Sequence, residues 1–241
     1  MKARLRLLLS IIALILALSL SLSSCNLLLD DQDLRIPSVD IDSIPEFDEN
    51  NPYVIINDNV PFFTDDEITA ESYEQYGALD GLGRCTVAIA CIGIEIMPTE
   101  ERGSIGSVKP SGWQTVKYDF ISGNYLYNRC HLIGYQLSGE NANKQNLITG
   151  TRYLNIDGML PFEDMVADYV KETQNHVMYR VTPIFEGDNL VASGVLIEAY
   201  SVEDKGEGIT FNIYAYNCQP GVIIDYATGD SHPKEYDWKI P

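Results

Sequence analysis

Apolar and polar positions alternate along residues 176–218, a pattern that is typical of half-buried β-strands. Two groups of turn residues interrupt the alternation, one at 186–189 and the other at 204–208. A period of two between such turns predicts a three-stranded antiparallel meander in this part of the chain.

Shorter patterns before the meander predict further strands and one helix start. The stretches 52–57 and 85–96 are rich in β-branched residues, so each is expected to form a strand. Thr64 and Glu67 have the spacing of a capping box, which predicts a helix that begins at Thr64. The stretch 101–112 is rich in Gly, Ser and Pro and is expected to be a loop.

The middle of the chain is expected to form a hairpin followed by two helices. Strands are predicted at 113–120 and 125–132, with a turn at 122–124 between them. Helices are predicted at 141–154 and 162–173. A strand-rich chain with a few inserted helices indicates the α+β fold class.

The N-terminus has the pattern of an export signal. Three basic residues precede an apolar run at 7–20, which is too short to be a typical membrane span. The run ends in Leu-Ser-Ser-Cys, which resembles a bacterial lipobox, so residues 1–24 are expected to be a lipoprotein signal peptide. Cys25 would then carry lipid and anchor an exported protein to the outer face of a bacterial membrane. The alternative is a plain signal peptide with an incidental cysteine, and release from the cell.

The distribution of charge restricts where a polyanion could bind. The formal net charge is −19, and 45% of the residues are apolar, which suffices for the core of one domain. Residues 30–80 hold 15 acids and one base, whereas residues 81–170 hold nine acids and seven bases. Residues 25–50 are therefore expected to be an acidic flexible tether, and 51–241 the domain. A nucleic-acid site would have to lie in the near-neutral middle, with metal ions to offset the phosphate charge.

Four cysteines follow Cys25, and the sequence leaves their pairing open. Cys85 and Cys91 lie too far apart along one expected strand to form a disulfide. A pair between Cys85 and Cys218 is compatible with an exported chain, but the sequence does not decide the connectivity. The sequence has no CxxC pair or Cys/His cluster with the spacing of zinc ligands.

The strongest candidate for chemistry is the stretch around His131, one of three histidines in the chain. His131 ends an expected strand, Asn155 lies near the end of the following expected helix, and Glu163 opens the next. A strand, a loop and a returning helix would bring these side chains face to face. A neutral imidazole can take a proton from water, and an amide oxygen suits Mg²⁺. Such a site could hydrolyse a phosphodiester with one metal ion, independently of base sequence.

Three segments strengthen this interpretation when they are taken together: NRCHLIGYQL at 128–137, NLITGTRYLN at 146–155 and LPFE at 160–163. They resemble the DNA/RNA non-specific endonuclease family, whose members are the ββα-metal or His-Me finger nucleases, and above all its secreted bacterial DNases. The resemblance extends from about Trp113 to Ser231. It implies a ββα-metal fold with a central antiparallel sheet and flanking helices.

The resemblance also implies a role for the matching residues. His131 would be the general base, and Asn155 the one direct protein ligand of Mg²⁺, for which Mn²⁺ could substitute. Glu163 would act on the water shell of the ion, and Asn146 would be a supporting amide. The expected protein is an exported, lipid-anchored, metal-dependent endonuclease that acts as a monomer on DNA, with RNA as a second candidate substrate. Its contact with the membrane would be through the lipid on Cys25 alone.

The motif around the histidine departs from the family at two positions. The family has Asp-Arg-Gly-His or Asn-Arg-Ser-His, so Asn128 replaces the commoner aspartate and Cys130 replaces Gly or Ser. Asn128 thereby removes a negative charge near the base. Arg129 would contact phosphate or position the motif, and it disfavours the imidazolium form, so the pKa of His131 is not expected to be raised strongly.

Structural alternatives remain for the individual residues. His131 could be a core histidine, Asn155 a helix end, Glu163 a first-turn acid that serves the helix dipole, and Arg129 a surface ion-pair residue. Lys144, Arg152 and Arg180 could line a DNA groove but are interpreted as solvated charges. The aromatic set Tyr125, Tyr127, Tyr135 and Tyr153 is interpreted as core and not as a base-stacking platform.

Two other classes of protein compete with the nuclease. The first is a catalytically inactive, nucleic-acid-binding lipoprotein on the same scaffold, which should have lost His131 or Asn155. The second is an unrelated β-rich adhesion or solute-binding lipoprotein, which leaves the motif segments unexplained.

Overall fold

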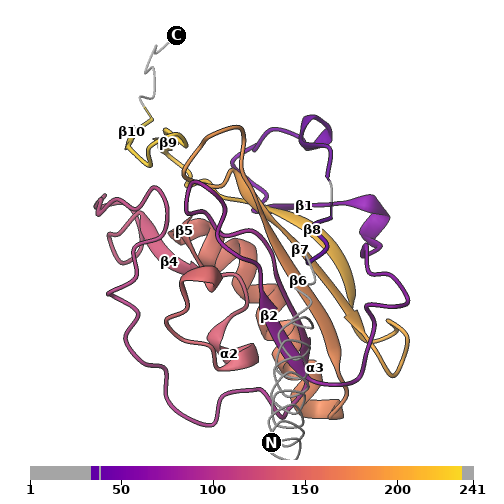
Figure 1. The fold of residues 1–241 in the computed structure, drawn as a ribbon. Helices are drawn as coiled ribbons and strands as arrows, with labels where there is room; N and C mark the ends of the chain where they lie inside the picture. Colours follow the sequence, from indigo (N-terminus) through magenta and orange to yellow (C-terminus); the bar gives the residue numbers. More distant parts are fainter. Residues whose placement is uncertain (1–33, 38, 235–241) are drawn as a thin grey trace, which may run out of the picture. The chain divides into compact units, whose positions relative to one another are not determined.

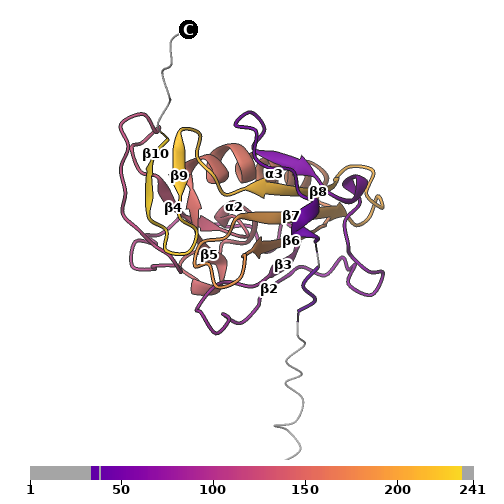
Figure 2. The same cartoon turned by 90° about the horizontal axis from the view of Figure 1, so that it is seen from above.

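The computed structural model describes residues 34–37 and 39–234, so the expected signal peptide and Cys25 lie outside the described residues. One compact unit begins at Arg35. Its centre is a six-stranded antiparallel sheet with the strand order β1-β8-β7-β6-β3-β2 (Figures 1 and 2). The six strands are β1 (Tyr53–Ile55), β2 (Tyr73–Tyr76), β3 (Ala88–Ile92), β6 (Val177–Ile184), β7 (Gly194–Ser201) and β8 (Thr210–Tyr216).

The remaining elements are short, apart from one helix. Two two-stranded sheets pair β4 with β5 and β9 with β10. The bounds are β4 (Tyr127–His131), β5 (Leu147–Thr151), β9 (Val222–Ile224), β10 (Ser231–Pro233), α2 (Tyr135–Ser138), α3 (Leu160–Thr173), and the turns η1 (Ile41–Ser43), η2 (Asn57–Asn59), η3 (Lys144–Asn146) and η4 (Leu154–Met159). In the described part of the chain, no helix is long and apolar enough to cross a membrane. The α+β class is confirmed.

The predicted meander is present as β6, β7 and β8, and it forms the floor of the main core. Tyr179, Ile197 and Phe211, one from each of the three strands, are buried in the same cluster as α3. The helix covers this face of the sheet (Figure 1). The helix expected at 162–173 is confirmed as α3, and its residues Phe162, Val166 and Val170 are buried in the same core. Each fully buried side chain of this kind contributes about 1.5–3 kcal/mol. The core thus holds the beginning of α3 against the sheet.

The opposite face of the sheet carries a buried ion-pair network. Arg180 on β6 lies opposite Glu198 on β7, and the two fully buried side chains form an ion pair with an Nε–Oε2 distance of 2.8 Å. The guanidinium also lies 2.7 Å from Glu67 and 4.5 Å from the ring centre of Phe63. The network fixes the segment 62–67 on the sheet.

This network explains why the helix expected at Thr64 is wrong. The Glu67 carboxylate does accept a hydrogen bond from the Thr64 backbone N–H at 2.8 Å, as a capping box requires. The same carboxylate binds buried Arg180, and the chain continues through turns into β2 instead of a helix. A tertiary ion pair therefore outweighs a weak local propensity.

The helix expected at 141–154 is also wrong. In its place the 3₁₀ turn η3 forms, capped by the side chain of Asn143, the chain then enters β5, and helical structure begins at Arg152. β5 contains β-branched residues and pairs with β4, so that Leu147 lies opposite His131. Asn155 consequently lies at the beginning of a helical segment and not near the end of one.

Several expected strands are shorter than predicted, among them the strand at 52–57, which is limited to β1, and the strand at 125–132, which is limited to β4. The strand at 85–96 is limited to β3, and the strand at 113–120 is reduced to one bridge between Lys117 and Tyr125. The turn at 122–124 is confirmed, because the Asn124 N–H donates to the Ile121 carbonyl at 2.8 Å. The segment 113–120 packs onto a small cluster separate from the main core, so few backbone pairs are needed to hold it.

The second half of the expected tether makes specific contacts with the domain. Phe47 packs against Tyr153 and Tyr216, with ring centres 5.9 and 5.5 Å apart. The hydroxyl of Tyr216 donates to the Pro45 carbonyl at 2.6 Å. Tyr153 precedes η4 directly, so this part of the segment supports the helical turn that carries Asn155.

We expect that a protein beginning at residue 51 melts roughly 5–10 °C below one beginning at residue 35. Each lost aromatic pair or hydrogen bond contributes about 0.5–1.5 kcal/mol, and 1 kcal/mol corresponds to about 2–4 °C for a chain of this size. Thermal unfolding of the two truncated proteins tests this. Equal melting temperatures would show that residues 35–50 do not stabilise the domain, and Phe47→Ala tests the aromatic contacts alone.

Candidate active site

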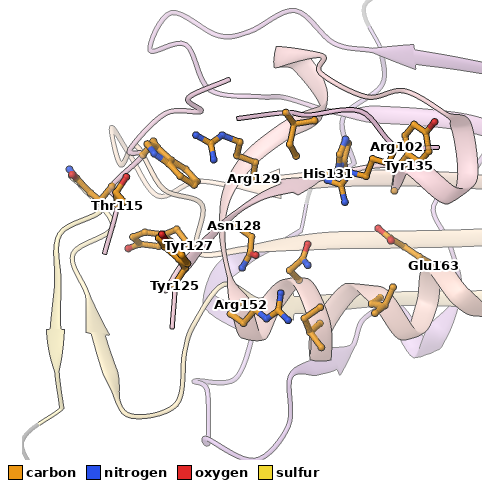
Figure 3. Close-up of a pocket in the computed structure, with 17 residues that line it drawn as sticks. Arg102, Thr115, Tyr125, Tyr127, Asn128, Arg129, His131, Tyr135, Arg152 and Glu163 are labelled. Atoms are coloured by element: carbon orange, nitrogen blue, oxygen red, sulfur yellow. Dashed lines mark hydrogen bonds between the residues drawn. The ribbon is translucent and has the colours of Figure 1, made fainter. Parts of the chain in front are cut away.

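An open pocket of about 730 Å³ lies beside β4 and the beginning of α3 (Figure 3). Asn146 is not among its lining residues, and Cys25 lies outside the described residues. The other predicted site residues all line the pocket, namely Asn128, Arg129, His131, Asn155 and Glu163. The structure therefore brings together the histidine, the amide and the carboxylate that the sequence predicts.

His131 is held in one tautomer by its two hydrogen bonds. Its Nε2 atom lies 2.8 Å from the carbonyl oxygen of Asn141, and its Nδ1 atom lies 3.2 Å from Nη2 of Arg102. A carbonyl can only accept a hydrogen bond and a guanidinium can only donate one. Nε2 therefore carries the hydrogen, and Nδ1 keeps the lone pair and is the basic nitrogen of the ring.

Burial keeps this imidazole neutral. The side chain is only 6% exposed. Burial, with a smaller contribution from the Arg102 guanidinium, lowers the pKa of His131 from 6.5 to about 4, and the bond to Asn141 opposes this only in part. The direction agrees with the expectation from the sequence, but the neighbouring cation is Arg102 and not Arg129.

A π-helical turn aligns Asn155 with Glu163. In a regular α-helix, two residues eight positions apart are offset by about 80° around the axis. In η4 the Leu160 N–H donates to the Asn155 carbonyl, an i to i+5 bond that inserts one residue into the turn. Asn155 and Glu163, which are eight positions apart, are then arranged like residues seven positions apart in a regular helix, with an offset of about 20° around the axis. Both side chains consequently face the same pocket.

Glu163 is buried in a space that a glycine leaves open. A Cβ atom at Gly134 would lie 2.4 Å from Oε2 of Glu163, so any side chain at this position would collide with the carboxylate. Burial and the neighbouring Asp164 raise the pKa of Glu163 to about 8, and a hydrogen bond from Gln136 opposes the rise. A cation bound beside the carboxylate would restore its negative charge at neutral pH.

Arg129 is committed to the protein's own backbone. Its Nη2 donates to the Gly106 carbonyl at 2.8 Å, its Nε donates to the Val108 carbonyl, and its guanidinium lies 4.0 Å from the ring centre of Trp113. Of the two roles considered for Arg129, these contacts favour positioning of the motif and the adjacent loop over contact with phosphate. Asn128 has a buried Nδ2 donor without a partner, which suits an anionic oxygen rather than a cation.

Two buried amides hold the hairpin in place. Asn146 accepts from the Ile133 N–H at 2.8 Å and donates to the Ile133 carbonyl at 3.0 Å, which fixes the chain just after His131. Asn217, at the end of β8, binds the backbone of Thr149 and Thr151 and so ties β5 to the main sheet. Asn146 therefore acts on the site through the backbone.

The sequence analysis missed or misread several residues of the pocket. Arg102 and the carbonyl of Asn141 both bind the imidazole, but each lies in a loop where single residues give no periodic signal. Arg152, interpreted as a solvated charge, lines the pocket, and so does Tyr125, interpreted as core, which is 46% exposed. The same interpretation is wrong for Arg180, which is fully buried in its ion pair with Glu198. Spacing from the motif could have identified Arg152, because it lies three residues before Asn155.

Comparisons with known proteins agree with this geometry. A model of the DNA/RNA non-specific endonuclease family matches residues 64–203. NucA from Streptococcus agalactiae with a magnesium ion bound is 26% identical, with a TM-score of 0.68, and the match covers 77% of this chain and 91% of that chain. The Sda1 nuclease with a bound zinc ion is 28% identical, with a TM-score of 0.57, and the match covers 67% of this chain and 81% of that one.

A streptococcal protein is a further relative in sequence. A deoxyribonuclease from Streptococcus dysgalactiae subsp. equisimilis is 30% identical over 111 residues, which are 44% of this chain and 33% of that protein. The alignment thus spans about a third of the length of this relative. The match supports the family.

A β-hairpin that presents a histidine to an amide and a carboxylate on one helix is the arrangement of the ββα-metal nucleases, and the fold matches structures of that class. The chain belongs to the DNA/RNA non-specific endonuclease family. The family match begins at residue 64 and ends at 203, so it starts earlier and ends earlier than the resemblance from Trp113 to Ser231 indicated.

Proposed function

We propose that this protein is a metal-dependent endonuclease that hydrolyses phosphodiester bonds of DNA, and also of RNA, without reading base sequence. The observation that carries the proposal is the neutral His131, whose basic Nδ1 is bound to Arg102 in the pocket that Asn155 and Glu163 also line. Three basic residues line this pocket, Arg102, Arg129 and Arg152, against the single acid Glu163. This local excess of positive charge suits a polyanion although the whole chain carries −19.

The donors in the pocket fit one hard divalent cation. Asn155 supplies an amide oxygen and Glu163 a carboxylate on the same helical face, and oxygen ligands are those that Mg²⁺ and Mn²⁺ prefer. The described residues contain no cluster of three or more His, Cys, Asp or Glu that could hold a metal. We assign Asn155 as the direct ligand and Glu163 as a residue that binds the water shell. When bound, the ion would stabilise the negative charge that develops on the phosphate and on the leaving oxygen.

The chain's own residues then carry the proton transfer. His131 takes a proton from the attacking water at Nδ1, and the Asn141 carbonyl stabilises the resulting imidazolium through Nε2–H. Nη2 of Arg102 lies 3.2 Å from Nδ1 of His131, so the attacking water must displace this guanidinium from the imidazole. The released guanidinium is then free to bind a phosphate oxygen.

The proposal is tested by digestion of supercoiled plasmid and of RNA with residues 26–241, with Mg²⁺ and with excess EDTA. Cleavage that needs Mg²⁺ and yields no preferred fragment is expected. Retained binding of nucleic acid with no cleavage under any metal would favour the alternative, an inactive binding module on the same scaffold. Cleavage that persists in excess EDTA would contradict the assignment of a metal to Asn155.

Gly134→Ala is expected to weaken Mn²⁺ binding by about 10–100-fold, the effect typical of disturbing groups around a metal site. The added methyl would collide with the Glu163 carboxylate, which must then move away from the pocket. Mn²⁺ titration followed by electron paramagnetic resonance measures the effect. Gly123→Ala is not a suitable control because Gly123 has a positive φ of 78°, whereas Gly81→Ala meets no neighbouring atom within 4 Å and should bind as wild type.

We further propose that the protein is exported and anchored by lipid on Cys25. The support is the apolar run that ends in Leu-Ser-Ser-Cys. Mass spectrometry of the mature N-terminus is expected to find a lipidated Cys25 as the first residue. A mature protein that begins at another residue, or a free thiol at Cys25, would contradict the anchor and leave the nuclease proposal intact.

A further inference from the structure

The motif cysteine contacts the proposed metal ligand. Cys130 is fully buried on β4, and its Sγ atom lies 2.9 Å from Oδ1 of Asn155 and 3.6 Å from Sδ of Met159. An amide oxygen can only accept a hydrogen bond, and the Cys130 thiol therefore donates its hydrogen to Oδ1 of Asn155.

The hairpin leaves space for this thiol. Gly150, on the paired strand β5, has no side chain, and a Cβ atom there would lie 2.6 Å from Cβ and 3.0 Å from Sγ of Cys130. The four cysteines in the described range, Cys130 included, are unpaired, so the disulfide considered between Cys85 and Cys218 is absent. The thiol thus remains free to donate its hydrogen bond.

No other hydrogen bond orients the Asn155 side chain within the described residues, since Cys130 is its one partner there. The terminal torsion of an asparagine is broad and allows the oxygen and the nitrogen to exchange places. With Nδ2 in the position of Oδ1, the amide would present hydrogens where a cation needs a lone pair. The orientation of this one amide therefore decides whether it can serve as a ligand.

We propose that Cys130 is a positioning residue that fixes the Asn155 amide for metal binding. One lone pair of Oδ1 accepts the thiol hydrogen, and the other stays available for the divalent ion. The inference rests on the proposed role of Asn155 as the metal ligand. It gives a function to the cysteine that replaces Gly or Ser in the motif.

The test measures Mn²⁺ binding to the nucleic-acid-free protein by electron paramagnetic resonance, beside nuclease rates. Cys130→Ala removes the donor and Cys130→Val removes it while filling the space, so both should raise the Kd for Mn²⁺ by about 10-fold or more. Cys130→Ser keeps a hydroxyl donor and should stay within about threefold of wild type. Cys91→Ala is the matched control, because Cys91 is an equally buried thiol that donates to the Thr69 carbonyl at 3.0 Å on another strand.

Thermal unfolding separates a folding defect from a binding defect, and the valine variant covers the case in which alanine leaves a destabilising cavity. Wild-type Mn²⁺ affinity in folded Cys130→Ala or Cys130→Val would overturn the inference. An equal loss in Cys130→Ser would also overturn it, because the hydrogen bond would not be the cause. If the wild-type protein binds no Mn²⁺ and cleaves no nucleic acid, the proposed function fails, and this inference with it.

Discussion

His131→Ala is expected to lower kcat by about 10²–10⁴-fold, the usual contribution of a general base. The reason is that Nδ1 of His131 is the basic nitrogen in the pocket, and no other histidine lines the pocket in the described part of the chain. The variant should keep wild-type affinity for Mn²⁺ and for DNA, because the imidazole is assigned as base and not as ligand. Steady-state kinetics and Mn²⁺ titration on the same preparation measure the two properties.

The dependence of the rate on pH provides an internal control. A pKa of about 4 for His131 means that the folded site keeps its base neutral well below the ordinary value of 6.5. The acid limb of kcat/KM is therefore expected below pH 6.5, with one proton per site, and it should be missing from the residual rate of His131→Ala. Loss of Mn²⁺ binding in His131→Ala, together with an unchanged pH profile, would make the imidazole a ligand and require another base.

The same pKa has a consequence for stability. Between pH 6.5 and about 4, the unfolded chain binds a proton on His131 and the folded chain does not. The free energy of unfolding should consequently fall as the pH drops through this window. His131→Gln removes this titration, and its stability should depend less on pH in the same range.

Long periodic elements could be predicted from the sequence because their signal is repeated many times. The meander β6–β8 and the helix α3 each bury one face, so alternation or helical spacing is enforced at every turn. The motif residues were also found, because 128–137 and 146–155 preserve a family pattern and not merely a residue type.

The helices predicted at Thr64 and at 141–154 are wrong because a single tertiary contact decides the local structure in each case. Glu67 has the spacing of a cap, yet buried Arg180 takes its carboxylate. The stretch 141–154 has many amides, yet β4 offers an unpaired edge, and β5 forms on it. Arg180 and β4 both lie outside the segments that they influence, so no local sequence pattern could have predicted these two structures.

The sequence predicted which residues form the site but not how they are arranged in it. Arg129 was expected to act on the base because it lies two residues before His131, and the two side chains do share a face of β4, but the Arg129 guanidinium binds the Gly106 and Val108 carbonyls instead. The cation at Nδ1 is Arg102, which lies 29 positions before His131 and reaches it from a loop. The π-turn that aligns Asn155 with Glu163 has no simple signature in the sequence, since it depends on where one inserted residue is accommodated.

Asn155→Ala is expected to abolish measurable Mn²⁺ binding and to lower the rate of DNA cleavage by at least about 10³-fold. A divalent ion contributes several kcal/mol of transition-state stabilisation, and each 1.36 kcal/mol corresponds to about tenfold in rate. The described residues offer no carboxylate cluster that could hold the ion in its place. The fold should survive, because the contacts of the Asn155 side chain with the protein are limited to one hydrogen bond from the Cys130 thiol.

Asn155→Asp is the matched variant, because it keeps an oxygen at the position of Oδ1 and adds a charge. It should bind Mn²⁺ at least as tightly as wild type, and retain far more activity than Asn155→Ala, while the thiol of Cys130 can still donate to the oxygen. Calorimetric Mn²⁺ titration and cleavage rates over a range of Mg²⁺ concentrations distinguish the two variants. If raising Mg²⁺ restores full activity to Asn155→Ala, the amide contributes affinity alone and the ion has another ligand. If Asn155→Ala is active in excess chelator, the reaction does not use the ion, and His131 with Arg102 must account for the whole rate.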